Sequence, residues 1–467
     1  MDVLLTHGYF LALDEAEQKV MRPYPPLGLL YLSAYLKRAG FQVEVFDSTF
    51  SQPSELERYV QEHRPPVVGI YGNLMTRPNV LRIMAWCREV GAMVVLGGPE
   101  PQSYATEYLR RGADIVVAGE GEATLLEILE RLQSDGQPDW SQVSGISFLQ
   151  EEGSVTATVA RAHLKDLDQL PFPDREAIRI DRYLSAWRER HGEGAVSLIT
   201  SRGCPYTCSW CSHGVFGYSY RSRSPENVAD EIEIIQDRYR PELLWFADDV
   251  FTMNRRWLTD LAGVLEQRRL RIPFETITRE DRIDEEIART LAEMGCRRIW
   301  VGAESGSQVV LDAMQRKTDA DRVTHVIELL RRQGIETGMF IMLGYEGEEE
   351  AEIFETTQLL KRARPDVFLT TVAYPIKGTP YSHQVEDRIL SPASWDQSSD
   401  RDLTIRGRHS RRYYRHVQRW MTSEVRLNDF RRKGKVATLP GLRAQTTAWL
   451  GRLGMHWTRG EKEGRGK

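Results

Sequence analysis

The sequence predicts an α/β protein whose first half is a doubly wound parallel sheet and whose second half is another series of strands and helices. Short apolar strands alternate with amphipathic helices through residues 1–140 and again through residues 195–385. A Pro-rich stretch, Asp168–Asp174, lies within residues 141–194, which we interpret as a linker. Residues 386–467 lack the alternation, and we expect them to form a basic, largely helical cap.

The first series contains five expected strands, at residues 2–5, 41–46, 67–71, 93–96 and 115–118. The expected helices between them lie at residues 31–39, 55–62, 80–90 and 104–110. Alternation at this spacing is typical of a Rossmann-like sheet, which binds its ligand beyond the carboxyl ends of the strands. Glycines there allow a backbone to approach a large ligand closely. The loops in question contain Gly72, Gly97, Gly98, Gly119 and Glu120.

The second series contains six expected strands, at residues 195–200, 243–247, 274–277, 298–303, 338–343 and 367–373. Helices are expected between them, for example at residues 257–267, 285–294, 322–333 and 349–363. Six strand–helix units predict a partial (β/α)6 barrel. Barrels carry their chemistry at the carboxyl ends of the strands. Polar residues gather there, with Asp248 and Asp249 after the second strand, Arg279 after the third and Glu304 after the fourth.

Between the two series, residues 145–148 and 154–159 predict a small hairpin. The helix after the first barrel strand has a favourable start, because Ser224 can cap it and Pro225 can occupy its first turn.

Composition places the chain among ordinary globular proteins, since 41% of its 467 residues are hydrophobic and 28% are charged. No secretory signal opens the sequence, and no apolar run approaches the ~18 residues of a membrane span, so we expect a cytoplasmic protein. A net charge of −5 does not favour nucleic-acid binding. Cys87 and Cys296 are isolated, and we expect them to pack in the core and form no disulfide.

The other three cysteines lie within eight residues, spaced C-x3-C-x2-C. Cys204, Cys208 and Cys211 can converge on one site, and soft sulfur ligands select zinc, copper(I) or iron–sulfur clusters. Structural zinc needs four protein ligands, and His213, two residues further on, is the available fourth. The alternative is a [4Fe-4S] cluster held by three thiolates, which leaves one iron open for a small molecule.

With Trp210 in the aromatic place, this stretch resembles the C-x3-C-x-aromatic-C signature of the radical S-adenosylmethionine (SAM) enzymes. The resemblance implies that Cys204, Cys208 and Cys211 are catalytic and bind a [4Fe-4S] cluster whose open iron chelates SAM. Reductive cleavage of SAM would then give a 5′-deoxyadenosyl radical, which takes a hydrogen atom from an unactivated substrate carbon. An electron donor such as flavodoxin or ferredoxin is implied as a partner.

The same resemblance suggests residues around SAM. Asp248 and Asp249 stand where the family has a Gly-Gly-Glu stretch, and we expect them to be polar residues of the pocket. Arg279 suits the SAM carboxylate and Glu304 the ribose hydroxyls, although the two could instead form a salt bridge at the barrel rim. Gly344 matches the motif beside adenine, but the proline that usually follows is missing here.

The first half resembles the cobalamin-binding domain that precedes the radical SAM core in class B methyltransferases and in anaerobic magnesium-protoporphyrin ester cyclases. The resemblance rests on three stretches, Pro26-Leu27-Gly28, Gly97-Gly98-Pro99 and Gly119-Glu120-Gly121-Glu122. It implies that cobalamin is bound by Leu27, Gly28, Gly72, Gly97, Gly98, Gly119 and Glu120.

One motif of many cobalamin proteins, D-x-H-x-x-G, is absent after the first strand, where Thr6-His7-Gly8-Tyr9 stands instead. Three interpretations therefore remain open. Cobalamin can be bound without a histidine ligand, His7 can be the ligand, or the domain can be a scaffold without cobalamin in which His7 is a hydrogen-bonded structural residue.

The resemblance implies a cobalamin-dependent C-methyltransferase first, with oxidative cyclisation or rearrangement as the alternative. A binding protein without activity would leave the cysteine loop unexplained. The substrate is expected to be a small molecule or a lipid, and an isoprenoid, a tetrapyrrole and a secondary metabolite are all compatible with the sequence.

The C-terminal region is basic, with 18 Lys or Arg against 5 Asp or Glu from Arg401 to Lys467. Helices are expected at residues 408–420 and 444–457, with Trp420, Trp449 and Trp457 among arginines. Such a segment can contact a membrane surface peripherally, or it can be a solvated cap over the barrel mouth. The residues after Arg459 are expected to be disordered.

Overall fold

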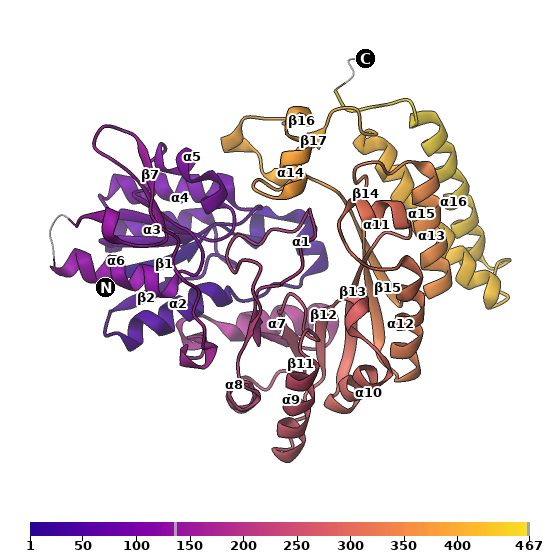
Figure 1. The fold of residues 1–467 in the computed structure, drawn as a ribbon, viewed down its shortest axis with the longest axis horizontal. Helices are drawn as coiled ribbons and strands as arrows, with labels where there is room; N and C mark the ends of the chain where they lie inside the picture. Colours follow the sequence, from indigo (N-terminus) through magenta and orange to yellow (C-terminus); the bar gives the residue numbers. More distant parts are fainter. Residues whose placement is uncertain (135–137, 465–467) are drawn as a thin grey trace. The chain divides into compact units, whose positions relative to one another are not determined.

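The computed structural model describes residues 1–134 and 138–464 (Figure 1). The chain divides into two compact units. The first consists of Met1–Pro205, Ser212–Asp248 and Ala393–Arg401, and the second of Tyr206–Cys211, Asp249–Pro392 and Asp402–Lys467. No helix among the described residues has the length and apolarity needed to cross a membrane.

The first unit contains a sheet with the strand order β2-β1-β3-β4-β5-β6-β7. Its five parallel strands are β1 (Val3–His7), β2 (Val43–Phe46), β3 (Val67–Tyr71), β4 (Met93–Gly97) and β5 (Ile115–Val117). These are the five strands that the sequence predicts. The expected hairpin forms β6 (Ile146–Leu149) and β7 (Val155–Ala157), and it extends the sheet as an antiparallel edge.

Helices cover both faces of this sheet, which confirms the doubly wound architecture. The helices are α2 (Leu27–Arg38), α3 (Pro53–His63), α4 (Arg77–Glu89), α5 (Ala105–Leu109) and α6 (Glu122–Ser134). One apolar core joins the sheet to α2 and α6, and a second joins it to α3, α4 and α5. The strand order reverses between β1 and β3, and the crevice at such a reversal is where doubly wound sheets bind ligands.

The first unit also contains the start of the second strand–helix series. Strands β8 (Ala195–Leu198) and β11 (Leu243–Phe246) are parallel neighbours. Helix α8 (Pro225–Tyr239) connects them, and the predicted cap is confirmed, because the Ser224 hydroxyl accepts the backbone N–H of Asn227. Helix α7 (Ile180–His191) precedes β8.

The second unit contains the remaining four predicted barrel strands. They are β12 (Phe274–Thr278), β13 (Cys296–Glu304), β14 (Glu336–Leu343) and β15 (Val367–Val372), and each is parallel to the next. Its helices are α9 (Arg255–Gln267), α10 (Glu285–Met294), α11 (Gln308–Ala313), α12 (Ala320–Arg332) and α13 (Glu350–Ala363). The carboxyl ends of four parallel strands therefore meet at one edge.

The shorter elements lie in the connections. They are α1 (Glu15–Val20), β9 (Ser201–Arg202), β10 (Arg221–Ser222), α14 (Pro380–Gln384), β16 (Ile389–Leu390) and β17 (Thr404–Ile405).

The C-terminal helices are α15 (Arg411–Arg432) and α16 (Leu439–Thr458), and both are longer than the sequence predicts. The expectation of disorder after Arg459 is wrong for residues 460–464. The backbone N–H of Ser410 donates to the Glu461 carbonyl, and the N–H of Glu463 donates to the Arg408 carbonyl. These bonds hold the chain end beside the start of α15. Residues 465–467 lie outside the described part of the chain.

A buried charge network fixes residues 393–401 within the first unit. The Arg77 side chain is only 2% exposed, and its Nε and Nη2 donate to Glu100 Oε1 at 2.6 Å and Asp400 Oδ1 at 2.9 Å. Its Nη1 donates to the carbonyls of Trp395 and Ser398. The Arg77 guanidinium thus compensates the negative charge of two buried carboxylates.

Candidate active site

The cysteine loop begins at the carboxyl end of β8. A short antiparallel pair, β9 with β10, turns the chain there, and Gly203 follows with φ of +85°. A Cβ on Gly203 would lie 2.2 Å from the carbonyl oxygen of Ser219, so only glycine fits this turn. Cys204, the next residue, is partly exposed and belongs to the first unit.

Asp248 holds the start of this loop. Its carboxylate is buried and accepts the backbone N–H groups of Thr200 and Ser201 at 2.8 and 2.7 Å and the Thr200 hydroxyl at 2.6 Å. Burial raises the pKa of Asp248 to about 6, although these hydrogen bonds oppose the shift. The carboxylate predicted to line the pocket thus positions the backbone just before the cysteines. Asp249, its neighbour, is exposed.

Residues 206–211 of the loop are fixed within the second unit. The Ser209 N–H and hydroxyl both donate to the Met314 carbonyl at 3.0 Å, and the Ser209 hydroxyl lies 2.7 Å from that of Tyr345. Trp210 is partly buried and packs on the apolar cluster that contains Tyr345. Cys208 is buried by this packing, whereas Cys211 is exposed.

Arg279 lies beside Cys208. Its Nη1 is 3.6 Å from the Cys208 sulfur, its Nε donates to Asp281 Oδ1 at 2.9 Å, and its Nη2 donates to the Arg316 carbonyl at 2.9 Å. Its guanidinium also stands 3.7 Å from the centre of the Tyr206 ring. The ion pair that Arg279 forms is with Asp281, and the alternative rim salt bridge with Glu304 is absent from the described residues.

Glu304 ends β13 in a strained conformation. Its φ is +62°, which is uncommon for a residue other than glycine, and the register with β14 shifts between Gly302 and Glu304. Burial raises the pKa of its carboxyl, and the nearby Arg316 opposes the shift. Strain of this kind is concentrated at functional sites.

Gly344 occupies the turn after β14 with φ of +71°. Its N–H donates to the buried carboxylate of Glu348, whose other oxygen has no hydrogen-bond partner. Burial raises the pKa of Glu348 to about 8. Glu348, four residues after Gly344, thus organises this loop, which lacks the proline that usually follows the glycine in the family.

We expect the Glu348→Gln substitution to flatten the pH dependence of stability. Between 4.5, the pKa of the exposed carboxyl, and about 8, the folded state keeps a proton that the unfolded state releases, so the free energy of unfolding falls as the pH rises. Glutamine still accepts the Gly344 N–H but does not ionise. From about pH 6 to about pH 9, the wild type should lose roughly 2–3 kcal/mol relative to the variant in urea denaturation. Parallel losses in both proteins would contradict this assignment.

In the first unit, Glu120 is engaged by arginines. Its carboxylate pairs with Arg202 at 2.7 Å and with Arg221 at 2.9 Å, and it accepts the Leu164 N–H. Burial alone would raise the pKa of Glu120, but these hydrogen bonds and charges keep that pKa below its usual value. Since Arg202 precedes Cys204 by two residues, Glu120 supports the strand that leads into the cysteine loop.

The glycines predicted to face a ligand fall into two groups. A Cβ on Gly72 would lie 2.7 Å from Pro101, and one on Gly98 would lie 2.3 Å from the Gly72 carbonyl oxygen, so the protein itself fills these spaces. No heavy atom lies within 4 Å of a Cβ on Gly28 or Gly97. Gly28, beside the buried Leu27, and Gly97 therefore leave room for a ligand. Gly119 has φ of +81°, and its N–H donates to Gln102.

His7 is buried and bonded through both ring nitrogens. Its Nε2 lies 3.0 Å from Asp47 Oδ1, and its Nδ1 accepts the Tyr9 N–H and lies 3.1 Å from the Ser48 hydroxyl. These contacts favour the structural interpretation of His7 over that of a cobalt ligand.

The donor set suits an iron–sulfur cluster. No three His, Cys, Asp or Glu side chains stand together as a metal site in residues 1–134 and 138–464. The three thiols nevertheless lie on one loop, and a cationic N–H donor stands beside one of their sulfurs, as is common around thiolate-bound clusters.

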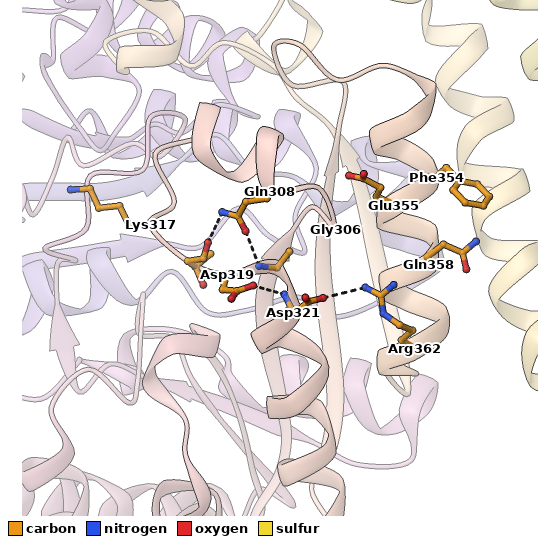
Figure 2. Close-up of a pocket in the computed structure, with 11 residues that line it drawn as sticks. Gly306, Gln308, Lys317, Asp319, Asp321, Phe354, Glu355, Gln358 and Arg362 are labelled. Atoms are coloured by element: carbon orange, nitrogen blue, oxygen red, sulfur yellow. Dashed lines mark hydrogen bonds and ion pairs between the residues drawn. The ribbon is translucent and has the colours of Figure 1, made fainter.

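A hollow of about 910 Å³ lies elsewhere in the second unit, at the starts of α11 and α12 and along α13 (Figure 2). Its polar groups bond largely to one another, since Gln308 donates to the Thr318 carbonyl and accepts the Ala320 N–H, and Arg362 faces Asp321 at 3.6 Å. None of the predicted site residues lines it.

Comparison with known families decides the nature of the cysteine loop. The model of the radical SAM superfamily matches residues 198–360, and the model of the B12 binding domain matches residues 18–129. The chain is a radical SAM enzyme with a B12-binding domain. The family recognised from the cysteine motif and the glycine loops is thus confirmed.

Two curated relatives of this radical SAM enzyme are named for different reactions. An uncharacterized methyltransferase of Pyrococcus horikoshii is 26% identical over 397 residues, which cover 82% of this chain and 84% of that protein. The anaerobic magnesium-protoporphyrin IX monomethyl ester cyclase of Rubrivivax gelatinosus is 28% identical over 354 residues. That alignment covers 74% of this chain and 63% of the cyclase, so the chain spans less than two thirds of the cyclase.

A solved structure shares the fold. The radical SAM methyltransferase TsrM from Kitasatospora setae, with cobalamin and a [4Fe-4S] cluster bound, matches with a TM-score of 0.69 at 20% identity. The match covers 84% of this radical SAM enzyme and 77% of TsrM.

The motif alone did not reveal three residues around Arg279. Tyr206, Asp281 and Arg316 hold its guanidinium from three directions. Tyr206 lies inside the cysteine loop and Asp281 two residues beyond Arg279, so closeness in sequence was the available signal. Arg316 gave no such signal.

Proposed function

We propose that this enzyme is a cobalamin-dependent radical SAM C-methyltransferase. The observation that carries the proposal is the presence, in one chain, of the three-cysteine loop and of a B12-binding domain with open glycine loops. When bound, the cluster and SAM supply a carbon radical and cobalamin supplies a methyl group. The protein binds these groups, orients them and excludes water.

The residues then have separate tasks. Cys204, Cys208 and Cys211 hold the cluster, and Arg279 donates a hydrogen bond toward the Cys208 sulfur, where it also offers positive charge to the SAM carboxylate. Glu304 serves the SAM ribose. Gly344 forms the turn beside the adenine, with the Tyr414 ring filling the space at its Cβ position, and Trp210 and Asp249 border the SAM pocket.

In the B12-binding domain, we assign cobalamin contacts to Leu27, Gly28, Gly97 and Gly119. We assign Gly72, Gly98 and Glu120 a supporting role in these loops. Protein atoms fill the Cβ positions of the two glycines, and Arg202 pairs with the Glu120 carboxylate. Cobalamin is bound without His7 as a ligand, since both nitrogens of that ring are already engaged.

Methyl transfer is favoured because the Pyrococcus relative, which is aligned over most of both chains, is named a methyltransferase, as is TsrM. The cyclase named above supports oxidative cyclisation as the second candidate. For either reaction we propose a small-molecule or lipid substrate, an electron donor such as flavodoxin or ferredoxin, and a location in the cytoplasm.

The test is anaerobic reconstitution with iron, sulfide and hydroxocobalamin, followed by gel filtration and metal analysis. We expect the protein to retain about four iron atoms and about one cobalt atom per chain. Iron without cobalt would reject the cobalamin-dependent function and leave radical chemistry of another kind.

The glycine loops provide a matched prediction. Gly97→Ala fits the backbone and meets no atom, so we expect an unchanged melting temperature but weaker retention of cobalamin. Gly98→Ala places a Cβ against the Gly72 carbonyl at φ of +105° and should lower the melting temperature markedly. Calorimetry and cobalt analysis of both variants measure these effects. Full cobalt retention by Gly97→Ala would exclude Gly97 from the cobalamin contacts.

A further inference from the structure

Helix α16 has one face built for close packing. Gly441, Ala444, Ala448, Gly451 and Gly454 are buried, and α16 lies alongside α15 (Figure 1). A Cβ on Gly451 would lie 2.8 Å from the Trp420 backbone nitrogen, and one on Gly454 would lie 2.2 Å from the His416 ring. Small residues therefore bring the two helix backbones together, which fixes the face that α16 turns outward.

The outward face of α16 carries a stripe of large apolar side chains, with the exposed Thr446 among them. Leu442, Trp449, Leu450 and Trp457 are 48%, 62%, 45% and 71% exposed, and Leu439 before them is 63% exposed. At roughly 100° per residue, these side chains fall on one face of the helix, and over 20 residues that face is about 30 Å long. An exposed stripe of this size with two tryptophans marks a binding surface.

The sequence around this stripe is basic. Residues 430–460 contain no Asp or Glu and seven basic residues, namely Arg431, Arg432, Lys433, Lys435, Arg443, Arg452 and Arg459. Arg443 borders the stripe on one side, whereas Arg452 and Arg459, on the other side, pair with Glu350 of α13 at 2.7 and 3.9 Å. The other four lie at the end of α15 and in the loop before α16.

We propose that the outer face of α16 binds an anionic membrane surface. Large aromatic side chains, leucines and flanking arginines are the features of helices that lie in the membrane interface. Each basic residue near an anionic bilayer adds electrostatic attraction. A second copy of this chain is a poorer occupant, because it would bring Arg443 and the basic residues before α16 against the same residues of the first copy.

Membrane binding would place the enzyme where lipid and isoprenoid substrates reside, a consequence that rests on the proposed function. The surface itself depends on neither the cluster nor cobalamin. Its test therefore requires no catalytic activity, and it can succeed or fail independently of methyl transfer.

The experiment is flotation of the 467-residue protein with vesicles of phosphatidylcholine alone and of phosphatidylcholine with about one third phosphatidylglycerol. We expect the wild type to float with the anionic vesicles only. The W449S/W457S variant should bind at least roughly tenfold more weakly, and R443E should bind more weakly and with less dependence on salt. The control is V159S/V309S, at two positions 81% and 66% exposed, which should bind as the wild type does.

Three results would overturn the proposal. The first is a wild type that floats with neither kind of vesicle, and the second is a W449S/W457S variant that floats as well as the wild type. The third is a dimer in light scattering that W449S/W457S converts to a monomer, since the stripe would then be an interface between copies. Circular dichroism checks that each variant is folded.

Discussion

Replacement of Cys208 by alanine is expected to remove the bound iron and to lower 5′-deoxyadenosine formation from SAM at least about a thousandfold. Cys208 is the buried member of the three cysteines, and Arg279 lies against its sulfur. Two remaining thiolates are too few to hold a cluster that already lacks a fourth protein ligand. Iron analysis and chromatography of the SAM products, both after anaerobic reconstitution, measure the two effects.

The chain supplies its own controls for this substitution. Cys87 and Cys296 are buried and isolated, and burial raises the pKa of Cys87 to about 12 and that of Cys296 well above its usual value. Thiols that stay protonated are poor metal ligands. Cys87→Ala and Cys296→Ala should keep their iron and their SAM cleavage. A Cys208→Ala protein with a full complement of iron would contradict the assignment of the cluster.

Replacement of Arg77 by methionine is expected to destabilise the first unit by about 3–5 kcal/mol. The substitution leaves the carboxylates of Glu100 and Asp400 buried without their cation. It also removes the hydrogen bonds that hold residues 395–398. We expect urea denaturation to show the loss and limited proteolysis to show faster cleavage within residues 393–401.

Arg82, which is exposed on the same helix, provides the matched control, because Arg82→Met should change stability by no more than about 0.5 kcal/mol. Neutralising the two acids in R77M/E100Q/D400N should restore part of the lost stability. If Arg77→Met were as stable as Arg82→Met, the network would have no part in holding residues 393–401.

Local patterns were enough to predict the strands. The expected strand at residues 298–303 lies within β13 (Cys296–Glu304), and the Ser224 cap forms as predicted. Alternation of apolar and polar residues and helix-capping residues act over a few positions, so a sequence displays them directly. The cysteine spacing is equally local.

Contacts between distant residues could not be predicted in this way. Arg77 and Asp400 are 323 positions apart, and Glu120 meets Arg202 across 82. In the sequence, the carboxylates of Asp400 and Glu120 look like surface charges or ligand contacts. Only the fold shows that each of them is paired with an arginine. The expected disorder after Arg459 failed for the same reason, since the bonds that hold Glu461 come from residues before α15.

The glycines and α16 show a related limit. Gly97 and Gly98 are neighbours in sequence, yet only Gly97 has open space at its Cβ position. The separation of small and large side chains along α16 is visible in the sequence, but which of the two sets faces the protein depends on α15. Packing decides such questions.

The proposal that this radical SAM enzyme uses cobalamin for methyl transfer is tested most directly with SAM that carries a deuterated methyl group. The reconstituted protein would be incubated anaerobically with this SAM and a reductant, and the cobalamin bound to it analysed by mass spectrometry. We expect the labelled methyl group on the cobalamin. Formation of 5′-deoxyadenosine while the retained cobalamin stays unlabelled would contradict methyl transfer and favour a cyclase or rearrangement enzyme.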